Sequence, residues 1–205
     1  MMKIEQALTE LRKSEGRKFE QGIDLIINLR KYDLRKNTIN IFVSLPHKIN
    51  EKKICGFLEN KSSLIDTISK VSFASYKEKK DLKKLVKKYD FFISSAANMP
   101  AVATSFGRAL GPAGKMPSPK LGIIVNETEK DIQEIIRKIN SVVRVQTKEP
   151  TIKLLIGKEK MKDEQIIDNI KAVYTAVLNE LPNNKDNIKS VMVKLTMSKP
   201  IKVEM

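Results

Sequence analysis

The apolar residues of this 205-residue chain follow two different spacings, and the spacing changes near His47 and again near Lys148. Outside these two points the pattern is mainly that of strands with one buried face, in which apolar and polar residues alternate. Between them, short apolar runs alternate with helical patterns, as in a parallel sheet covered on both faces. We therefore expect the middle of the chain to be an α/β insertion within a unit built from both ends.

The individual elements follow from the same spacings. The end segments predict a helix at 4–11, strands at 23–29, 39–45 and 151–156, a helix from about residue 163, and strands at 188–195 and 201–203. The middle predicts strands at 53–58, 71–75 and 90–94 and helices at 62–70, 77–88, 98–106 and 127–139.

The charge balance points to a polyanionic partner. The chain has 39 Lys and Arg against 24 Asp and Glu, a formal net charge of +15. Such an excess attracts nucleic acid first and an anionic membrane surface second. The alternative is a charge bias that the whole proteome shares.

Several function classes lose support from the sequence. The apolar stretches are shorter than the ~20 residues of a membrane-spanning helix, and the N-terminus is typical of an amphipathic helix rather than a secretory signal. The one cysteine, Cys55, allows no internal disulfide and no cysteine zinc cluster, and its apolar strand context is that of a small hydrophobic residue. His47, the one histidine, has no recognisable catalytic partner. We therefore expect an intracellular, soluble protein without catalytic residues, metal or cofactor.

Residues 107–119 hold three Gly and three Pro, which predicts a backbone that is neither helix nor strand. Gly114-Lys115 suggests a phosphate-binding loop, but Ala109 and Met116 stand where that loop requires Gly and Ser or Thr. Residues 111–114 also match the bare GxxG of an RNA-clamping loop. A rigid surface loop is the alternative that composition favours.

Two basic stretches differ in what they indicate. Residues 77–88 form an amphipathic pattern whose lysines fit a solvated helix face. Lys18 and Phe19 place a cation beside an aromatic ring at the start of a strand, where phosphate contact and stacking on a base can combine. Arg35 and Lys36 add charge near the other end of that strand.

Three stretches together resemble the large-subunit ribosomal protein L-one family, in its archaeal and eukaryotic form. They are residues 18–22 followed by 44–47, residues 107–119, and residues 193–197. The resemblance covers nearly the whole chain. It implies an α/β and α+β protein of two domains. Domain I, residues 1–47 and 149–205, is a discontinuous split β-α-β domain with an antiparallel sheet. Domain II, residues 48–148, is an inserted Rossmann-like three-layer α/β/α domain.

The resemblance also implies a function. Family members are cytoplasmic, non-enzymatic components of the large ribosomal subunit that bind its rRNA and form the mobile stalk beside the tRNA exit site. The implied partners are large-subunit rRNA, exit-site tRNA and, in many members, the protein's own mRNA, whose translation it represses; the free protein is a monomer with no membrane partner. Two alternatives remain: a nucleotide-dependent enzyme that uses the Rossmann-like domain, and a free RNA chaperone or repressor.

Matching motif positions place the RNA-binding site on domain I. The candidate residues are Lys18, Phe19, Gln21, Gly22, Arg35, Lys36, Lys158, Thr196, Met197 and Ser198. Hydroxyl groups there suit ribose and phosphate, and Phe19 and Met197 suit sugar and base faces. The chain departs from the family pattern twice: Gly22 stands where Ser or Thr is usual, and Ser198-Lys199 where Gly-Pro is usual.

Overall fold

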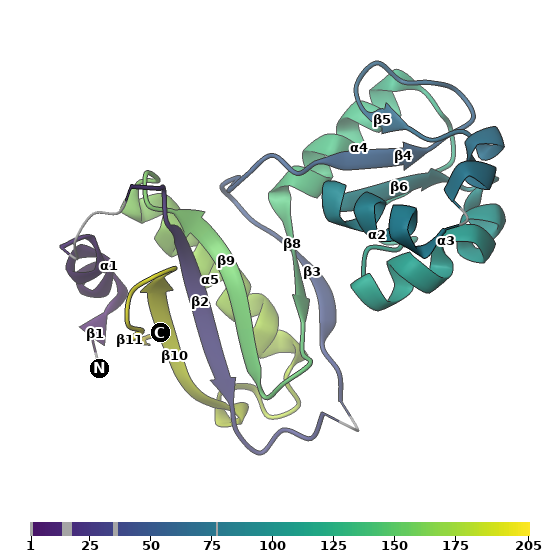
Figure 1. Cartoon of the computed structure of the whole chain (residues 1–205). Helices are drawn as coiled ribbons and strands as arrows, with labels where there is room; N and C mark the ends of the chain where they lie inside the picture. The colour runs from purple at the N-terminus through teal and green to yellow at the C-terminus, as the bar shows by residue number, and fades with distance from the viewer. Residues whose placement is uncertain (1, 14–17, 35–36, 77) are drawn as a thin grey trace. The chain divides into compact units, whose positions relative to one another are not determined.

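The computed structural model describes residues 2–13, 18–34, 37–76 and 78–205 of a mixed α/β protein (Figure 1). Its internal contacts divide the chain into two compact units. Unit 1 comprises Met1–Ile49 and Ser141–Met205, and unit 2 comprises Asn50–Asn140.

Unit 1 is built on a five-stranded sheet in the order β1-β11-β10-β2-β9. Strand β2 is antiparallel to both of its neighbours, β10 and β9, and only β1 runs parallel to its neighbour β11. Every second side chain of β2 is buried against α5 and α1, as the alternation of apolar residues predicts. The elements are β1 (Met2–Lys3), α1 (Ile4–Arg12), β2 (Gly22–Leu29), β9 (Thr151–Lys158), α5 (Asp163–Glu180), the 3-10 helix η2 (Asn184–Asn187), β10 (Ile188–Leu195) and β11 (Ile201–Glu204).

A two-stranded antiparallel ribbon, β3 (Asn40–Ser44) with β8 (Val142–Gln146), completes unit 1. Its inward side chains, among them Val43 and Val145, are buried in the core of that unit. Residues 141–148 therefore lie in unit 1, whereas the boundary predicted from the sequence is at residue 148. The difference arises because β8 follows α4 with no intervening turn residues, and its partner β3 lies about a hundred residues earlier in the chain.

Unit 2 contains a parallel four-stranded sheet in the order β5-β4-β6-β7, with helices on both faces. Phe57, Phe92 and Phe106 are fully buried between one face and the helices η1, α2 and α3. Isoleucines of α4 cover the other face. The elements are β4 (Ile54–Phe57), β5 (Asp66–Thr67), η1 (Lys70–Tyr76, a 3-10 helix), α2 (Lys79–Lys88), β6 (Phe91–Ser95), α3 (Met99–Ala113), β7 (Ile123–Ile124) and α4 (Glu129–Ser141).

Two predicted elements of the middle segment are wrong. Residues 62–70 contain the short strand β5 rather than a helix, and residues 71–75 lie in η1 rather than in a strand. The sequence Val71-Ser72-Phe73 imitates a strand, but Val71 is 89% exposed and Phe73 is buried. A single buried aromatic residue on a helical turn, Phe73, thus gives the same apolar–polar–apolar sequence as a half-buried strand.

The Gly- and Pro-rich segment is also different from its prediction, because residues 107–113 form the second half of α3. Pro112 lies in the last turn, so its missing N–H removes one i→i−4 hydrogen bond next to the end of the helix. The helix ends at Gly114, whose φ of 67° is the left-handed conformation that glycine adopts readily. Glycine thus acts here as a helix terminator two residues after the proline.

Lys115 has a structural role that explains its place after Gly114. Its ammonium group donates to the carbonyl oxygens of Val86 and Tyr89, each at 2.8 Å. These carbonyls lie at the C-terminal end of α2, where a cation is favourable. The lysine therefore joins α2 to the end of α3.

Within the part of the chain that is described, no helix is long and apolar enough to cross a membrane. The same residues contain no cluster of three or more His, Cys, Asp or Glu side chains that could hold a metal ion.

Cys55 should be unreactive in the folded protein. Its side chain is fully buried in β4, and burial raises the pKa of the thiol to about 12. Because the thiolate is the reactive form, we expect no labelling by a disulfide reagent at mildly alkaline pH, and one equivalent after unfolding in urea. The measurement is the absorbance of the released thiolate. Rapid labelling of the native protein would contradict this burial.

Candidate nucleic-acid interface

One end of the unit 1 sheet gathers the described candidate residues that are far apart in sequence. β2 begins there, while β9 and β10 end there, because both are antiparallel to β2 (Figure 1). Gly22 pairs with Lys158 of β9. The backbone N–H of Thr196 donates to the carbonyl of Gly22 at 3.0 Å. We call this area, formed by residues 18–22, 155–159 and 195–199, the sheet-end surface.

Gln21 anchors the sheet-end surface from within. Its side chain is only 3% exposed, and its Oε1 accepts the backbone N–H of Met197 at 3.2 Å. Its backbone also bonds to Glu159 in both directions, through the Glu159 N–H at 2.9 Å and the Glu159 carboxylate at 3.2 Å. Gln21 thus positions the loop after β10 instead of presenting its own amide to solvent.

The hydroxyl groups of Thr196 and Ser198 also hold the loop. Thr196 Oγ1 accepts the N–H of Gly22 at 3.1 Å and donates to its carbonyl at 3.2 Å. Ser198 Oγ accepts the N–H of Leu195 at 2.9 Å and has the carbonyls of Leu195 and Lys199 within 3.3 Å. A hydroxyl oxygen has two lone pairs, so each keeps one acceptor position for an outside donor.

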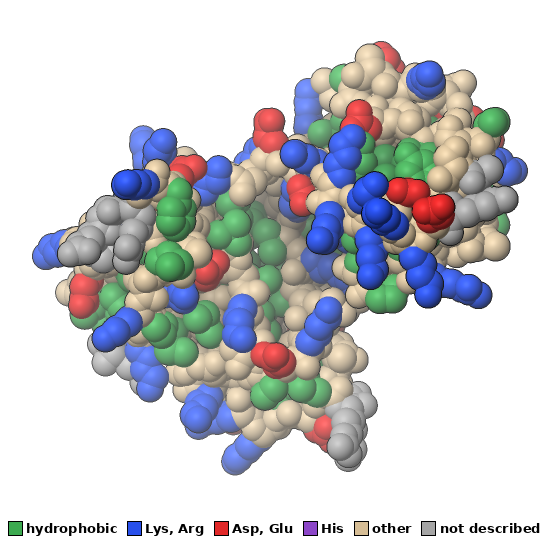
Figure 2. All heavy atoms as spheres, viewed as in Figure 1, with side chains coloured by type: hydrophobic (Ala, Val, Ile, Leu, Met, Phe, Trp, Pro, Cys, Tyr) green, Lys and Arg blue, Asp and Glu red, His purple; other side chains and the backbone are tan. Residues whose placement is uncertain are grey.

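Apolar side chains project from this fixed frame. Among the described residues of unit 1, three large hydrophobic side chains are exposed: Phe19 at 53%, Leu155 at 38% and Met197 at 63%. All three belong to the sheet-end surface, and Figure 2 shows hydrophobic side chains exposed among Lys and Arg on this unit. Apolar surface held in place beside cations is typical of a binding site.

Comparison with known proteins identifies the family. A family model described as "Ribosomal protein L1p/L10e family" matches residues 11–199. The chain belongs to this family.

Curated relatives match over almost their whole length. "Large ribosomal subunit protein uL1" of Pyrococcus horikoshii is 35% identical over 214 residues, which cover 98% of this chain and 95% of the relative. The proteins of the same name from Nanoarchaeum equitans and Methanocaldococcus jannaschii are each 35% identical, with 99% and 97% of this chain covered and 100% and 94% of the relative.

Position 22 is one of the two places where we expected a departure from the family pattern, and the structure shows what surrounds it. A Cβ atom on Gly22 would lie 2.5 Å from Cδ1 of Leu155 and 3.4 Å from Oγ1 of Thr196. The end of the Leu155 side chain therefore occupies the space that a Cβ at position 22 would need. Leu155 was not among the predicted site residues. Its place between Leu154 and Ile156 in one strand is a signal for it, because neighbouring side chains of a strand face opposite ways.

The charges at the sheet-end surface are mixed. Lys18 is exposed, and Lys158 forms an ion pair with Glu20 at 3.3 Å. Burial raises the pKa of the Asp24 carboxyl, and the Lys194 ammonium, which faces it across β2 and β10, partly opposes that rise. Arg35 and Lys36 lie outside the described residues.

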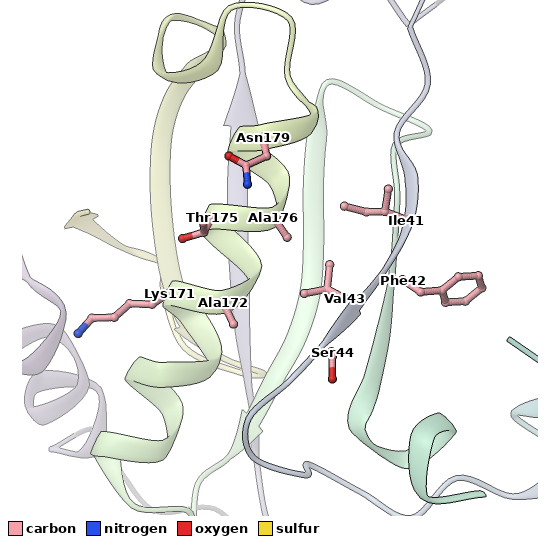
Figure 3. A pocket seen from close by; sticks show the side chains of 9 residues that line it. All are labelled: Ile41, Phe42, Val43, Ser44, Lys171, Ala172, Thr175, Ala176 and Asn179. Atoms are coloured by element: carbon pink, nitrogen blue, oxygen red, sulfur yellow. The ribbon is translucent and has the colours of Figure 1, made fainter. Parts of the chain in front are cut away.

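A groove between β3 and α5 is a further concave surface of unit 1 (Figure 3). Ile41 and Val43 point toward Ala172 and Ala176 across it. Lys171 is the one charged side chain among the described residues that line it. An apolar groove with one cation suits a phosphate backbone less well than the sheet-end surface does.

Proposed function

We propose that this protein is a structural component of the large ribosomal subunit and binds large-subunit rRNA through the sheet-end surface. The observation that carries the proposal is the exposure of Phe19, Leu155 and Met197 at one end of the sheet, where internal hydrogen bonds fix the loop that holds Met197. Membership of the family, and relatives named as large-subunit proteins, support the ribosomal assignment.

The chemistry of the surface suits a folded RNA. Folded RNA is recognised by shape, by stacked or splayed bases and by its 2′-hydroxyls. Phe19 and Met197 offer apolar area for sugar and base faces, and the hydroxyl oxygens of Thr196 and Ser198 can each accept one further hydrogen bond. Because the loop is already ordered, little conformational entropy is lost when RNA binds.

The finer features implied by the family belong to the same proposal. We infer that unit 1 is the RNA-binding domain and unit 2 an inserted Rossmann-like domain. The protein would lie in the mobile stalk of cytoplasmic ribosomes, touch exit-site tRNA, bind its own mRNA as a repressor, and be a monomer when free. The nucleotide-enzyme alternative is weakened because Lys115 uses its ammonium group on the carbonyls of α2. Co-sedimentation with large subunits separates a ribosomal protein from a free repressor.

Met197→Ala and Thr196→Ala are expected to weaken binding of a large-subunit rRNA stalk fragment without unfolding the protein. Loss of an exposed apolar contact, or of the hydroxyl that holds the loop, should cost about 1 kcal/mol, roughly fivefold in affinity. Titrations at several salt concentrations also give the number of phosphates contacted, since each contributes roughly 0.9 to the log–log slope. The matched control is Val71→Ala, because Val71 is 89% exposed but lies on unit 2.

Three further results decide the test. Thr196→Ser should restore affinity, since it keeps the hydroxyl. Unchanged affinity in both alanine variants, with melting preserved, places the site elsewhere. Equal affinity of the wild type for the stalk fragment and for an unrelated RNA argues against specific rRNA binding.

A further inference from the structure

The positive charge of this protein is shared by its two units. Unit 2 contains seventeen Lys and Arg against ten Asp and Glu, a net charge of +7, and unit 1 has twenty-two against fourteen, a net charge of +8. The sheet-end surface lies on unit 1 alone, so it leaves about half of the excess without a role.

Most of the unit 2 excess lies on one helix. α2 contains six lysines and one aspartate in ten residues, and all six lysines are exposed. Figure 2 shows Lys and Arg side chains gathered over the face of unit 2 where Figure 1 places α2. We call these residues the α2 lysine face; they are Lys79, Lys80, Lys83, Lys84, Lys87 and Lys88.

Most of these ammonium groups have no carboxylate partner. Lys84 lies 3.5 Å from Asp81, and Lys88 lies 3.4 Å from Asp66. Among the residues that the structure describes, the other four have no ion pair. The solvated-face interpretation accounts for their exposure but not for their concentration.

The concentration carries a cost for the isolated protein. Six lysine pairs lie three or four residues apart along α2, against one favourable pair with Asp81. Each like-charge pair of this spacing destabilises a helix by roughly 0.2–0.5 kcal/mol. Burial of Leu82 and Leu85 and the capping by Lys115 hold the helix despite this repulsion. A bound polyanion would relieve it.

We propose that the α2 lysine face is a second RNA-binding surface, which contacts the phosphate backbone of an RNA duplex without reading its sequence. A ten-residue helix is about 15 Å long, enough to face several successive phosphates. The face has lysines and no exposed aromatic side chain, which favours phosphates over bases as ligands. This inference rests on the proposed function only in taking RNA as the physiological polyanion.

An anionic membrane fits the same charges less well. A helix that lies on a membrane inserts an apolar face between the lipids. The apolar face of α2 is occupied, because Leu82 and Leu85 are 9% and 6% exposed within the unit 2 core. Its lysines could therefore meet lipid headgroups only by charge.

The test compares two charge-matched variants of the full chain. One variant combines Lys80→Gln, Lys83→Gln and Lys87→Gln, which form a single stripe on α2. Its control combines Lys61→Gln, Lys130→Gln and Arg137→Gln, three exposed cations of unit 2 outside α2. Each variant lowers the net charge by three. The probe is a short RNA duplex of arbitrary sequence, titrated at several salt concentrations.

The α2 variant should lower the log–log salt slope by about 2–3, since each lost phosphate contact removes roughly 0.9. Its affinity should fall at least about tenfold near physiological salt, while the control variant stays close to the wild type. The melting temperature of the α2 variant should be unchanged or higher, because like-charge pairs are removed. Replacement of the same three lysines by arginine should keep both slope and affinity.

Other outcomes overturn the proposal. A log–log salt slope of the α2 variant equal to that of the wild type contradicts it. An equal loss of RNA affinity in both variants also contradicts it, because such a result indicates that binding depends on the overall charge of the protein. Loss of binding to phosphatidylserine vesicles, with RNA binding unchanged, assigns the face to membranes. None of these results depends on Met197 or Thr196, so failure of this inference and failure of the proposed function are distinguishable.

Discussion

Asn169→Ala is expected to lower the free energy of unfolding by about 3–5 kcal/mol, because it leaves several buried polar groups without partners. Asn169 lies on α5 and is 0% exposed. Its Oδ1 accepts the N–H of His47 at 3.1 Å, and its Nδ2 donates to the carbonyls of His47 at 3.1 Å and Ile156 at 3.0 Å. Urea unfolding followed by circular dichroism measures the loss.

Asn179→Ala is the matched control for this prediction. Asn179 lies on the same helix but is exposed, so its replacement should change stability by no more than about 0.5 kcal/mol. Equal effects of the two substitutions would show that the Asn169 hydrogen bonds contribute little. The same hydrogen bonds fix the backbone of His47 just before the chain enters unit 2.

The local elements of unit 1 were predictable because each shows its own periodicity. β2 and β10 bury alternate residues, and the first turn of α5 contains acidic residues, which suit a helix N-terminus. The structure of the Gly- and Pro-rich segment was not predictable, because Pro112 and Gly114 can end a helix as readily as they can form a loop. Composition does not distinguish a helix end from a loop. The distance of the proline from the end of the helix does distinguish them.

The prediction of the sheet-end surface depended more on the family motifs than on the spacing of apolar residues. Motifs near both ends of the chain predicted the site residues Lys18, Phe19, Thr196 and Met197. The spacing of apolar residues alone does not predict that residues 19 and 197 lie close together. The structure adds what motifs cannot contain, namely that Gln21 is buried beneath the loop and that Leu155 fills the space beside Gly22. RNA contact by these residues stays a prediction.

Two deletions of the middle segment are expected to have opposite outcomes. Removal of residues 50–140, with a short Gly/Ser bridge from Ile49 to Ser141, should leave a cooperatively folded protein that still binds the rRNA stalk fragment. The N–H of Leu45 donates to the carbonyl of Ser141 at 2.7 Å, so the two chain crossings are adjacent. The remaining 114 residues keep the unit 1 core and the sheet-end surface.

Removal of residues 48–148, the boundaries that the sequence pattern indicates, should instead destabilise the product severely. It deletes β8, which pairs with all five residues of β3. It also deletes Thr147, whose Oγ1 accepts the N–H of Ile39 at 2.9 Å. Ile39 and Val43, now 1% and 6% exposed, would lose Val145 as a core neighbour, together with the partly buried Val143 and Ile49. Such losses are large relative to the stability margin of many small domains.

Thermal melting of both deletions, and titration of each against one rRNA fragment at one salt concentration, decide between these expectations. Equal stability would show that the β3–β8 ribbon is dispensable to unit 1. A folded 50–140 deletion that binds RNA without specificity would mean that the specific site requires unit 2. If it keeps specific binding with a reduced salt slope, the reduction measures the contribution of unit 2 cations, of which the α2 lysine face holds the largest share.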